Sequence, residues 1–291
     1  MCDEQTMKDV EEYLRRNALT RREFGKRGAG AALALMLPPV ANALDVVERD
    51  VMVPTPDGES DCYFVHPESG AHAAVIVWPD IVSIRPAFRA MGKRLAESGY
   101  SVLVVNPYYR TARGAVVPEG KGFRDPGIRE MLMPHARSLS PETCVSDGRA
   151  YVEWLDSQES VDTGRKIGTT GYCMTGSYTM RLAAAIPDRI GAGGSFHGGG
   201  LATDEDDSPH LLAGQMKAGF LIAIAENDDE RDPEAKVKLR EAFDAAGVTA
   251  EIEVYEDALH GWCPPDSAVY HEAQAERAWS RLLVLFEREL A

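Results

Sequence analysis

Short apolar runs alternate with longer amphipathic stretches along most of this chain. Continuous apolar runs, such as residues 73–78 and 101–106, are typical of strands that are buried on both faces of a sheet. Between these runs, apolar side chains recur three or four positions apart, at Phe88, Met91 and Leu95, and this spacing indicates one face of a helix. The sequence therefore predicts strands and helices that follow one another in turn.

The same alternation continues to the end of the chain. Two stretches of alternating polarity, at residues 45–53 and 60–65, flank a turn sequence at residues 55–58 and predict an opening hairpin. Further strands are predicted at residues 166–170, 190–196, 219–225 and 251–255, and helices at residues 86–98, 141–157, 178–185, 233–246 and 270–290. Repeated units of strand and helix imply an α/β fold with a mostly parallel central sheet and helices on both faces. We predict a single domain over residues 44–291.

Residues 109–139 break this pattern, because they show no clear period and mix basic residues with glycines and prolines. The basic side chains are Arg110, Arg113, Lys121, Arg124, Arg129 and Arg137. Long unpatterned loops in compact domains are usually functional or mobile, so we interpret this segment as a wall or lid over a site. A solvated surface excursion is the alternative.

Composition limits the class of protein and its partners. The chain has 291 residues, of which 44% are hydrophobic and 26% are charged, as in ordinary soluble globular proteins. Its formal net charge of −15 argues against nucleic acid and anionic membranes as partners. The five cysteines form no C-x-x-C pair, and residues 168–171 lack the G-x-G-x-x-G spacing. We therefore expect neither a metal nor a dinucleotide cofactor.

The first 43 residues differ from the rest and are typical of an export leader. Residues 20–26 resemble the twin-arginine motif, and an uncharged run at residues 28–37 follows them. This run is too short to span a membrane, and Ala41-Asn42-Ala43 provides a cleavage pattern. We expect a periplasmic protein whose mature chain begins at residue 44. The alternative is a cytoplasmic protein with a basic helix start and an apolar core helix at this end.

A cysteine stands between a predicted strand and a predicted helix. Cys173 follows the strand at residues 166–170 and precedes the helix at residues 178–185, with Gly171 two positions before it. This is the layout of a nucleophile elbow, in which serine is more usual. A helix N-terminus favours thiolate, and the N–H of Met174 is placed to donate to an oxyanion. A buried packing cysteine is the alternative interpretation.

A cysteine nucleophile needs a base and a third group that orients the base. Of the seven histidines, His260 alone follows the last predicted strand and precedes the last predicted helix, where the base belongs in this chain order. The acid is expected after the strand at residues 219–225. Spacing from that strand favours Asp228, and spacing back from Pro233 favours Asp229. We select Asp228, and an acidic helix cap is the alternative role.

Together these motifs resemble those of the dienelactone hydrolases, a branch of the α/β-hydrolase superfamily that uses cysteine. The likeness covers residues 46–290, and its matching residues are Gly171-Tyr172-Cys173-Met174, Asp228, Tyr255-Glu256, Ala258, His260-Gly261 and the segment 75–81. The resemblance implies an α/β-hydrolase fold and a catalytic triad of Cys173, His260 and Asp228. It also implies an oxyanion hole formed by the N–H groups of Met174 and Ile81.

Three further positions take their expected roles from the resemblance. Asp80 stands where the family has a glutamate that holds the resting cysteine and helps to generate thiolate. Thr175 stands where glycine is common for close packing of the helix on the strand. Arg110 is the nearest match to an arginine that meets a substrate carboxylate. Asp80 and Arg110 are therefore candidates for thiol activation and substrate binding.

The expected activity is hydrolysis of a small carboxylic ester or lactone through a thioacyl-enzyme, and Arg110 with the basic loop suggests an anionic acyl group. Asp80 and Thr175 leave open a second hypothesis, an exported non-catalytic binding protein on a hydrolase scaffold. A metal-dependent enzyme that uses His197 and His260 is a weaker third. The sequence does not determine the oligomeric state. Three cysteines are unassigned, and an oxidising periplasm could join two of them: Cys62, Cys144 and Cys263.

Overall fold

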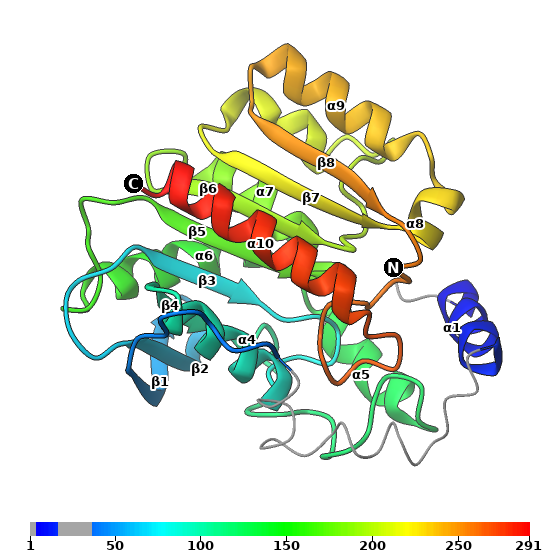
Figure 1. Cartoon of the computed structure of the whole chain (residues 1–291), viewed down its shortest axis with the longest axis horizontal. Helices are drawn as coiled ribbons and strands as arrows, with labels where there is room; N and C mark the ends of the chain where they lie inside the picture. Colours follow the sequence, from blue (N-terminus) through cyan, green and yellow to red (C-terminus); the bar gives the residue numbers. More distant parts are fainter. Residues whose placement is uncertain (1–3, 17–36) are drawn as a thin grey trace.

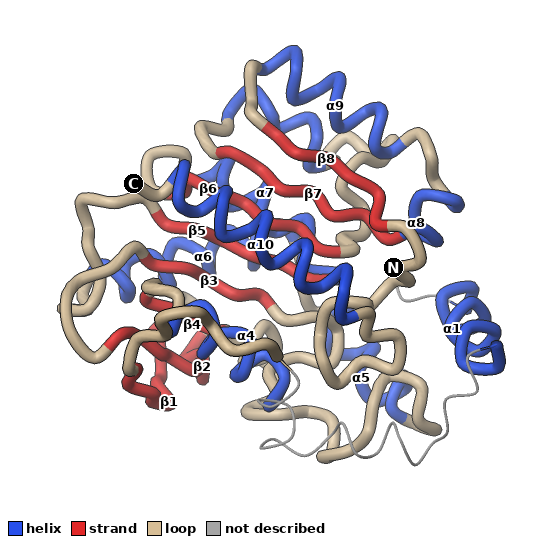
Figure 2. Tube along the Cα trace, viewed as in Figure 1, coloured by secondary structure: helices blue, strands red, loops and turns tan. Residues whose placement is uncertain are grey.

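A single eight-stranded sheet forms the centre of the protein (Figure 1). The computed structural model describes residues 4–16 and 37–291. The strands lie side by side in the order β1-β2-β4-β3-β5-β6-β7-β8 (Figure 2). Their bounds are β1 (Val46–Thr55), β2 (Gly58–Pro67), β3 (Ala74–Trp78), β4 (Ser101–Val104), β5 (Ile167–Tyr172), β6 (Ile190–Phe196), β7 (Gly219–Ala225) and β8 (Ala250–Tyr255).

The strands are antiparallel at one edge of the sheet and parallel over the rest. β1 pairs with β2, and β2 with β4, in antiparallel register. Every neighbouring pair from β4 to β8 is parallel. The predicted α/β fold with a mostly parallel sheet is thereby confirmed. The hairpin strands run longer than predicted, because pairing extends to Thr55 and Gly58 at the turn and to Val46 and Pro67 at the far end.

Helices cover both faces of the sheet. Their bounds are α4 (Pro86–Glu97), α5 (Ile128–Arg137), α6 (Pro141–Asp156), α7 (Gly176–Ala185), α8 (Glu226–Arg231), α9 (Ala235–Ala246) and α10 (Glu272–Glu289). Alternate residues of β3 face opposite cores. Ile76 and Trp78 pack in the cluster that includes residues of α6, α7 and α9. Val75 and Val77 pack in the cluster that includes residues of α4 and α10. Figure 1 shows α4 and α10 crossing the near face.

Within residues 44–291, two α-helices lie where the sequence pattern predicted none. α8 occupies the acidic stretch after β7, and α5 lies within the basic segment 109–139. The buried side chains of α5, Ile128 and Leu132, pack in a small cluster with Ile81 and Tyr108. This part of the segment is therefore packed against the loop that follows β3.

The N-terminal segment begins with a helix, α1 (Glu4–Arg16). The twin-arginine residues 20–26 and all but the last residue of the uncharged run 28–37 lie outside the described residues. Among the helices that the structure describes, none is both long and apolar enough to cross a membrane.

All the cysteines of residues 37–291 are buried, and none of them forms a disulfide. Cys62 and Cys144 belong to the core on one face of the sheet, whereas Cys263 belongs to the core on the other. The disulfide suggested for an oxidising compartment is therefore not formed among these three residues.

Candidate active site

Cys173 lies at the carboxyl end of β5, where the 3₁₀ turn η1 (Cys173–Thr175) leads into α7. Its φ is +57°, in the left-handed region that residues with a side chain rarely adopt. Such strained positions cluster at functional sites. Gly171 leaves room for this turn, because a Cβ there would lie 2.2 Å from the carbonyl oxygen of Thr175. The turn therefore requires glycine at 171 and carries the cysteine just beyond the end of the strand.

Thr175 anchors this turn to the neighbouring loop. Its hydroxyl accepts the N–H of Tyr172 at 2.9 Å and lies 2.9 Å from the carbonyl oxygen of Trp78, at the end of β3. Glycine at position 175 would allow the helix to pack closely on the strand, and in this protein Gly176 allows that close packing instead. A Cβ on Gly176 would lie 2.5 Å from the Cα of Gly198. Threonine at position 175, where glycine is common, thus adds hydrogen bonds that tie the cysteine turn to the loop after β3.

His260 joins Cys173 to an acid. It lies between β8 and α10, and its Nδ1 lies 2.6 Å from Oδ2 of Asp228. The same imidazole forms a side-chain hydrogen bond with Cys173. Its backbone N–H donates to Oδ1 of Asn227 at 2.8 Å, which fixes the loop that carries the ring. Cys173, His260 and Asp228 therefore form one continuous chain of hydrogen bonds.

The structure distinguishes between Asp228 and Asp229, which sequence spacing left as alternative candidates for the acid. Asp229 pairs with Lys236 at 2.5 Å, whereas Asp228 lies 2.6 Å from Nδ1 of His260. Both aspartates lie on α8, where one step along the helix turns a side chain by about 100°. Asp228 is therefore the carboxylate in contact with the imidazole.

The charges around His260 change its protonation. Burial by itself lowers the pKa of this imidazole, but the neighbouring Cys173 thiolate and Asp228 carboxylate outweigh it and raise the pKa to about 10. The raised pKa means that a proton is retained on the ring at neutral pH. The arrangement thus favours an imidazolium that faces a thiolate.

The two residues expected to form the oxyanion hole lie in one packed cluster. Ile81 lies in the turn after β3, and Met174 packs against the cluster that contains Ile81. The Tyr108 hydroxyl donates to the carbonyl oxygen of Ile81 at 3.0 Å and lies 3.7 Å from Sδ of Met174. Met174 is in the first turn of η1, whose leading N–H groups have no partner within the helix. Sequence reasoning did not identify Tyr108, which bridges the two.

Asp80 is held in an ion-pair network. Arg85 contacts both of its carboxylate oxygens, at 2.6 and 3.0 Å, and the N–H of Val82 donates to Oδ1 at 2.9 Å. Burial raises the pKa of Asp80, the positive charge of Arg85 opposes this shift, and the nearby Cys173 adds to it. Asp266, in the loop after His260, binds the other side of Arg85 at 2.6 Å. No local sequence pattern predicts this network, because Arg85 and Asp266 are 181 positions apart.

Arg110 is paired away from the cysteine. Its guanidinium contacts Asp147 of α6 at 2.7 and 2.8 Å and Asp57 of the β1–β2 turn at 2.7 Å. The guanidinium also lies over the ring of Tyr109. These contacts connect the basic segment to α6 and the hairpin, so the geometry does not support the expected role of Arg110 in binding a substrate carboxylate.

His197 lies next to His260 without joining the hydrogen bonds among Cys173, His260 and Asp228. The ring centroids of His197 and His260 are 5.0 Å apart, and the His197 backbone has a φ of +40°. Burial, together with the charge of His260, holds the pKa of His197 well below its usual value. Within residues 4–16 and 37–291, no three potential metal ligands come together, so the structure offers no support for the metal-dependent hypothesis.

The first helix contacts α8, the segment that carries Asp228. Asp9 of α1 accepts a hydrogen bond from Asn227 at 2.9 Å and forms an ion pair with Arg231. Arg231 also contacts Thr6, at 3.0 Å, and lies 3.6 Å from Asp228. Figure 1 shows α1 beside α8 at the carboxyl end of the sheet. Part of the expected leader is therefore docked on α8.

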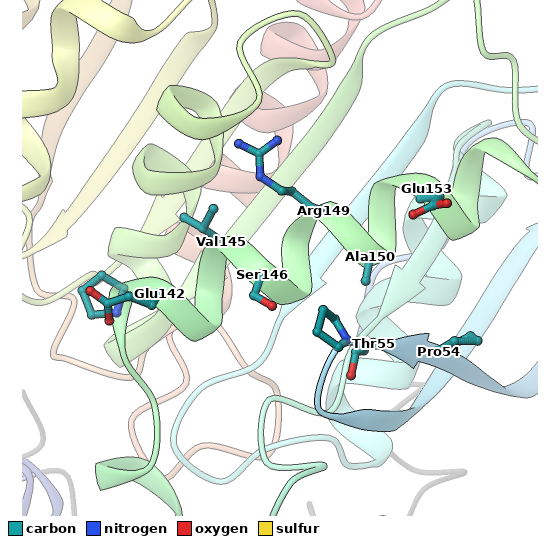
Figure 3. A pocket seen from close by; sticks show the side chains of 10 residues that line it. Pro54, Thr55, Glu142, Val145, Ser146, Arg149, Ala150 and Glu153 are labelled. Carbon is teal, nitrogen blue, oxygen red and sulfur yellow. The ribbon is translucent and has the colours of Figure 1, made fainter.

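A large surface groove lies elsewhere, between the end of β1 and α6 (Figure 3). Its volume is about 860 Å³, and its lining includes Pro54 and Thr55 of β1 and Ser146, Arg149 and Glu153 of α6. The residues that line the groove include none of those around Cys173. We therefore assign it no part in the chemistry of the cysteine site.

The strand order, with a cysteine after β5, an aspartate after β7 and a histidine after β8, defines a protein of the α/β-hydrolase class. The chain belongs to the dienelactone hydrolase family, whose model matches residues 61–290. It is therefore a hydrolase that acts on esters or lactones.

Individual relatives agree with this assignment. A Methylorubrum extorquens protein provisionally named a carboxymethylenebutenolidase is 26% identical over 286 residues, which cover 94% of each chain. The carboxymethylenebutenolidase of Rhodococcus opacus is 25% identical over 77% of this chain and 84% of its own. A Klebsiella pneumoniae structure provisionally named a dienelactone hydrolase superposes with a TM-score of 0.71 at 23% identity. It covers 84% of this chain and 99% of its own, and it supports the fold.

Proposed function

We propose that this protein cleaves a carboxylic ester or lactone through a thioacyl intermediate on Cys173. The observation that carries the proposal is the hydrogen-bonded chain from Cys173 through His260 to Asp228. A nucleophile, a base and a group that orients the base are the parts that acyl transfer requires. The names of the relatives support the same class of substrate.

In the proposed first half-reaction, the Cys173 thiolate attacks the carbonyl carbon and forms a C–S bond. The N–H groups of Met174 and Ile81 stabilise the oxyanion. His260 gives its proton to the departing alkoxide as the C–O bond breaks. In a lactone, that alcohol stays attached to the acyl group.

In the second half-reaction, His260 takes a proton from water, which attacks the thioester carbon. The C–S bond then breaks, and the site returns to a thiolate that faces an imidazolium. Asp228 keeps Nδ1 of the imidazole protonated, so Nε2 is the nitrogen that exchanges protons. The strained cysteine turn acts as a nucleophile elbow in this scheme.

Thiol reactivity distinguishes the enzyme from a binding protein on the same scaffold. We expect the alkylation rate of Cys173 by iodoacetamide to change less than about threefold between pH 6 and 9, because His260 retains the proton in place of sulfur. A His260→Gln variant should regain the steep rise with pH of an ordinary thiol. A steep rise in the unmodified protein, with no turnover of an ester and lactone panel, would favour the binding protein.

Residues 1–43 are proposed to direct export by the twin-arginine route, leaving residues 44–291 as the catalytic domain in the periplasm. Exchange of Arg21 and Arg22 for lysine is expected to retain the protein in the cytoplasm. Fractionation and intact mass check this prediction, since the exported form should begin at Leu44. A full-length chain found only in the cytoplasm of cells with the unaltered protein would contradict it.

A further inference from the structure

The buried amide of Asn227 links the N-terminal helix α1 to the loop that carries His260. Its Nδ2 donates to Oδ2 of Asp9 at 2.9 Å, and its Oδ1 accepts the backbone N–H of His260 at 2.8 Å. Burial by itself raises the pKa of Asp9, but hydrogen bonds, the largest of which comes from Asn227, lower it, so this carboxylate is ionised at neutral pH. An ionised carboxylate only accepts hydrogen bonds and a backbone N–H only donates, so these two neighbours allow a single orientation of the amide.

The same carboxylate balances the charge of Arg231. Arg231 forms an ion pair with Asp9 and lies 3.6 Å from Oδ1 of Asp228. The side chains of Arg231, Asp9 and Asp228 are 26%, 22% and 20% exposed, so solvent screens their charges only in part. Without the negative charge of Asp9, Arg231 would draw Asp228 away from the imidazolium of His260 and so weaken that pair.

Further contacts hold α1 in this position. Thr6 and Val10 are buried, and they lie on one face of the helix because they are four positions apart. The Thr6 hydroxyl accepts a hydrogen bond from Arg231 at 3.0 Å. On another side of the helix, Glu11 lies 3.8 Å from Arg124 of the basic segment. The helix is therefore anchored to α8 and to the basic segment at once.

Charged and titratable groups approach His260 and Asp228 from several elements. Those in contact with this pair, or with its neighbour on α8, are Cys173 of η1, His197 after β6, Arg231 of α8 and Asp9 of α1. Burial lowers the pKa of His197, so its ring is neutral. Arg231 is thus the cation of this set that competes with the imidazolium for Asp228, and Asp9 is the acid that offsets it.

We infer that Asp9 and Asn227 are positioning residues for His260, and that α1 places Asp9 for this role. The inference rests on the proposed function, because it concerns the residue proposed as the base. Asn227 holds the backbone of His260, and Asp9 keeps Arg231 from competing for Asp228. Because Asp9 lies within residues 1–43, a chain that keeps this segment should stay active to higher pH than a chain that has lost it.

The alkaline fall in kcat/KM for p-nitrophenyl butyrate, corrected for uncatalysed hydrolysis, tests the inference in the full chain. Asp9→Asn keeps an oxygen that can accept from Asn227 but removes the charge, so the fall should move to lower pH by about half a pH unit or more. Combining Asp9→Asn with Arg231→Gln should return the fall to its original pH, because the competing cation is gone. A purely structural effect of Asp9→Asn would not be reversed in this way.

Glu11→Gln is the matched control, because it removes one negative charge from the same helix at a position that contacts Arg124 instead of α8. It should leave the alkaline fall in place. An equal movement in Glu11→Gln, or none in Asp9→Asn when Asp228→Asn does move the fall, would overturn the inference and leave the proposed function intact. An alkaline fall that Asp228→Asn does not move would instead count against the proposed function.

Asn227→Ala tests the backbone contact separately. Loss of the bond to the His260 N–H should misplace the imidazole, so kcat should fall by about tenfold while KM stays within about twofold. A thermal melt shows whether the variant is folded. A folded Asn227→Ala variant with unchanged kcat would exclude the role given to Asn227.

Discussion

Replacing Cys173 with alanine is expected to lower kcat/KM for ester hydrolysis by about 10⁴-fold or more. The reason is that the proposed reaction proceeds through a bond to this sulfur. In other enzymes, removal of the nucleophile of a catalytic triad lowers the rate by a factor of this order. The fold should persist, because alanine is smaller than cysteine and the buried turn is held by Thr175 rather than by the thiol. Initial rates with a chromogenic ester, together with a thermal melt, check both parts.

Cys144→Ala is the matched control for this experiment. Cys144 is also buried and forms no disulfide, but it lies on α6, in the core on one face of the sheet, and outside the hydrogen-bonded chain. Its loss should leave kcat/KM within about threefold of the unaltered protein. A folded Cys173→Ala variant with undiminished turnover would exclude the thioacyl mechanism.

Replacing Asp228 with asparagine is expected to lower kcat/KM by about 10³-fold. The amide keeps the shape of the side chain but loses the charge and favours the wrong imidazole tautomer. Asp229→Asn is a close control, because Asp229 pairs with Lys236 instead of His260. It should change kcat/KM by less than about threefold. Equal losses in the two variants would mean that the acidic turn acts only through its overall charge.

Replacing Asp228 with asparagine should also change the pH dependence of kcat/KM. In the unaltered protein the pKa of His260 is raised to about 10, so the imidazolium persists through neutral pH and is lost as the pH approaches 10. The alkaline fall in kcat/KM should follow that loss. Asp228 contributes to the raised pKa, so in Asp228→Asn the fall should move to lower pH. An alkaline limb that stays in place would show that Asp228 does not set the charge on the ring.

The sequence was most informative where function depends on chain order. A nucleophile, an acid and a base that each follow a strand of a parallel sheet must meet at one edge, because the carboxyl ends of those strands are adjacent. That rule predicted that Cys173 and His260, which are far apart in the chain, lie close together. It could not separate Asp228 from Asp229, because the choice depends on the rotation of α8, a helix the pattern did not predict.

The sequence failed where a side chain depends on a distant partner. Arg110 was expected to face the substrate, but its partners Asp57 and Asp147 are 53 and 37 positions away, and no local pattern reveals them. The pair of Arg85 and Asp266 is further apart still. Ion pairs of this kind depend on the packed fold, and they decide which cations remain available to a ligand.

Mass spectrometry of an acid-quenched reaction tests the central claim most directly. When a slow ester substrate is mixed with the protein and quenched within the first turnover, the peptide that contains Cys173 should gain the mass of the acyl group. The gain should disappear on treatment with hydroxylamine, as a thioester does, and it should be absent from Cys173→Ala. Steady turnover with no acyl group on that peptide at any time before product release would contradict the account.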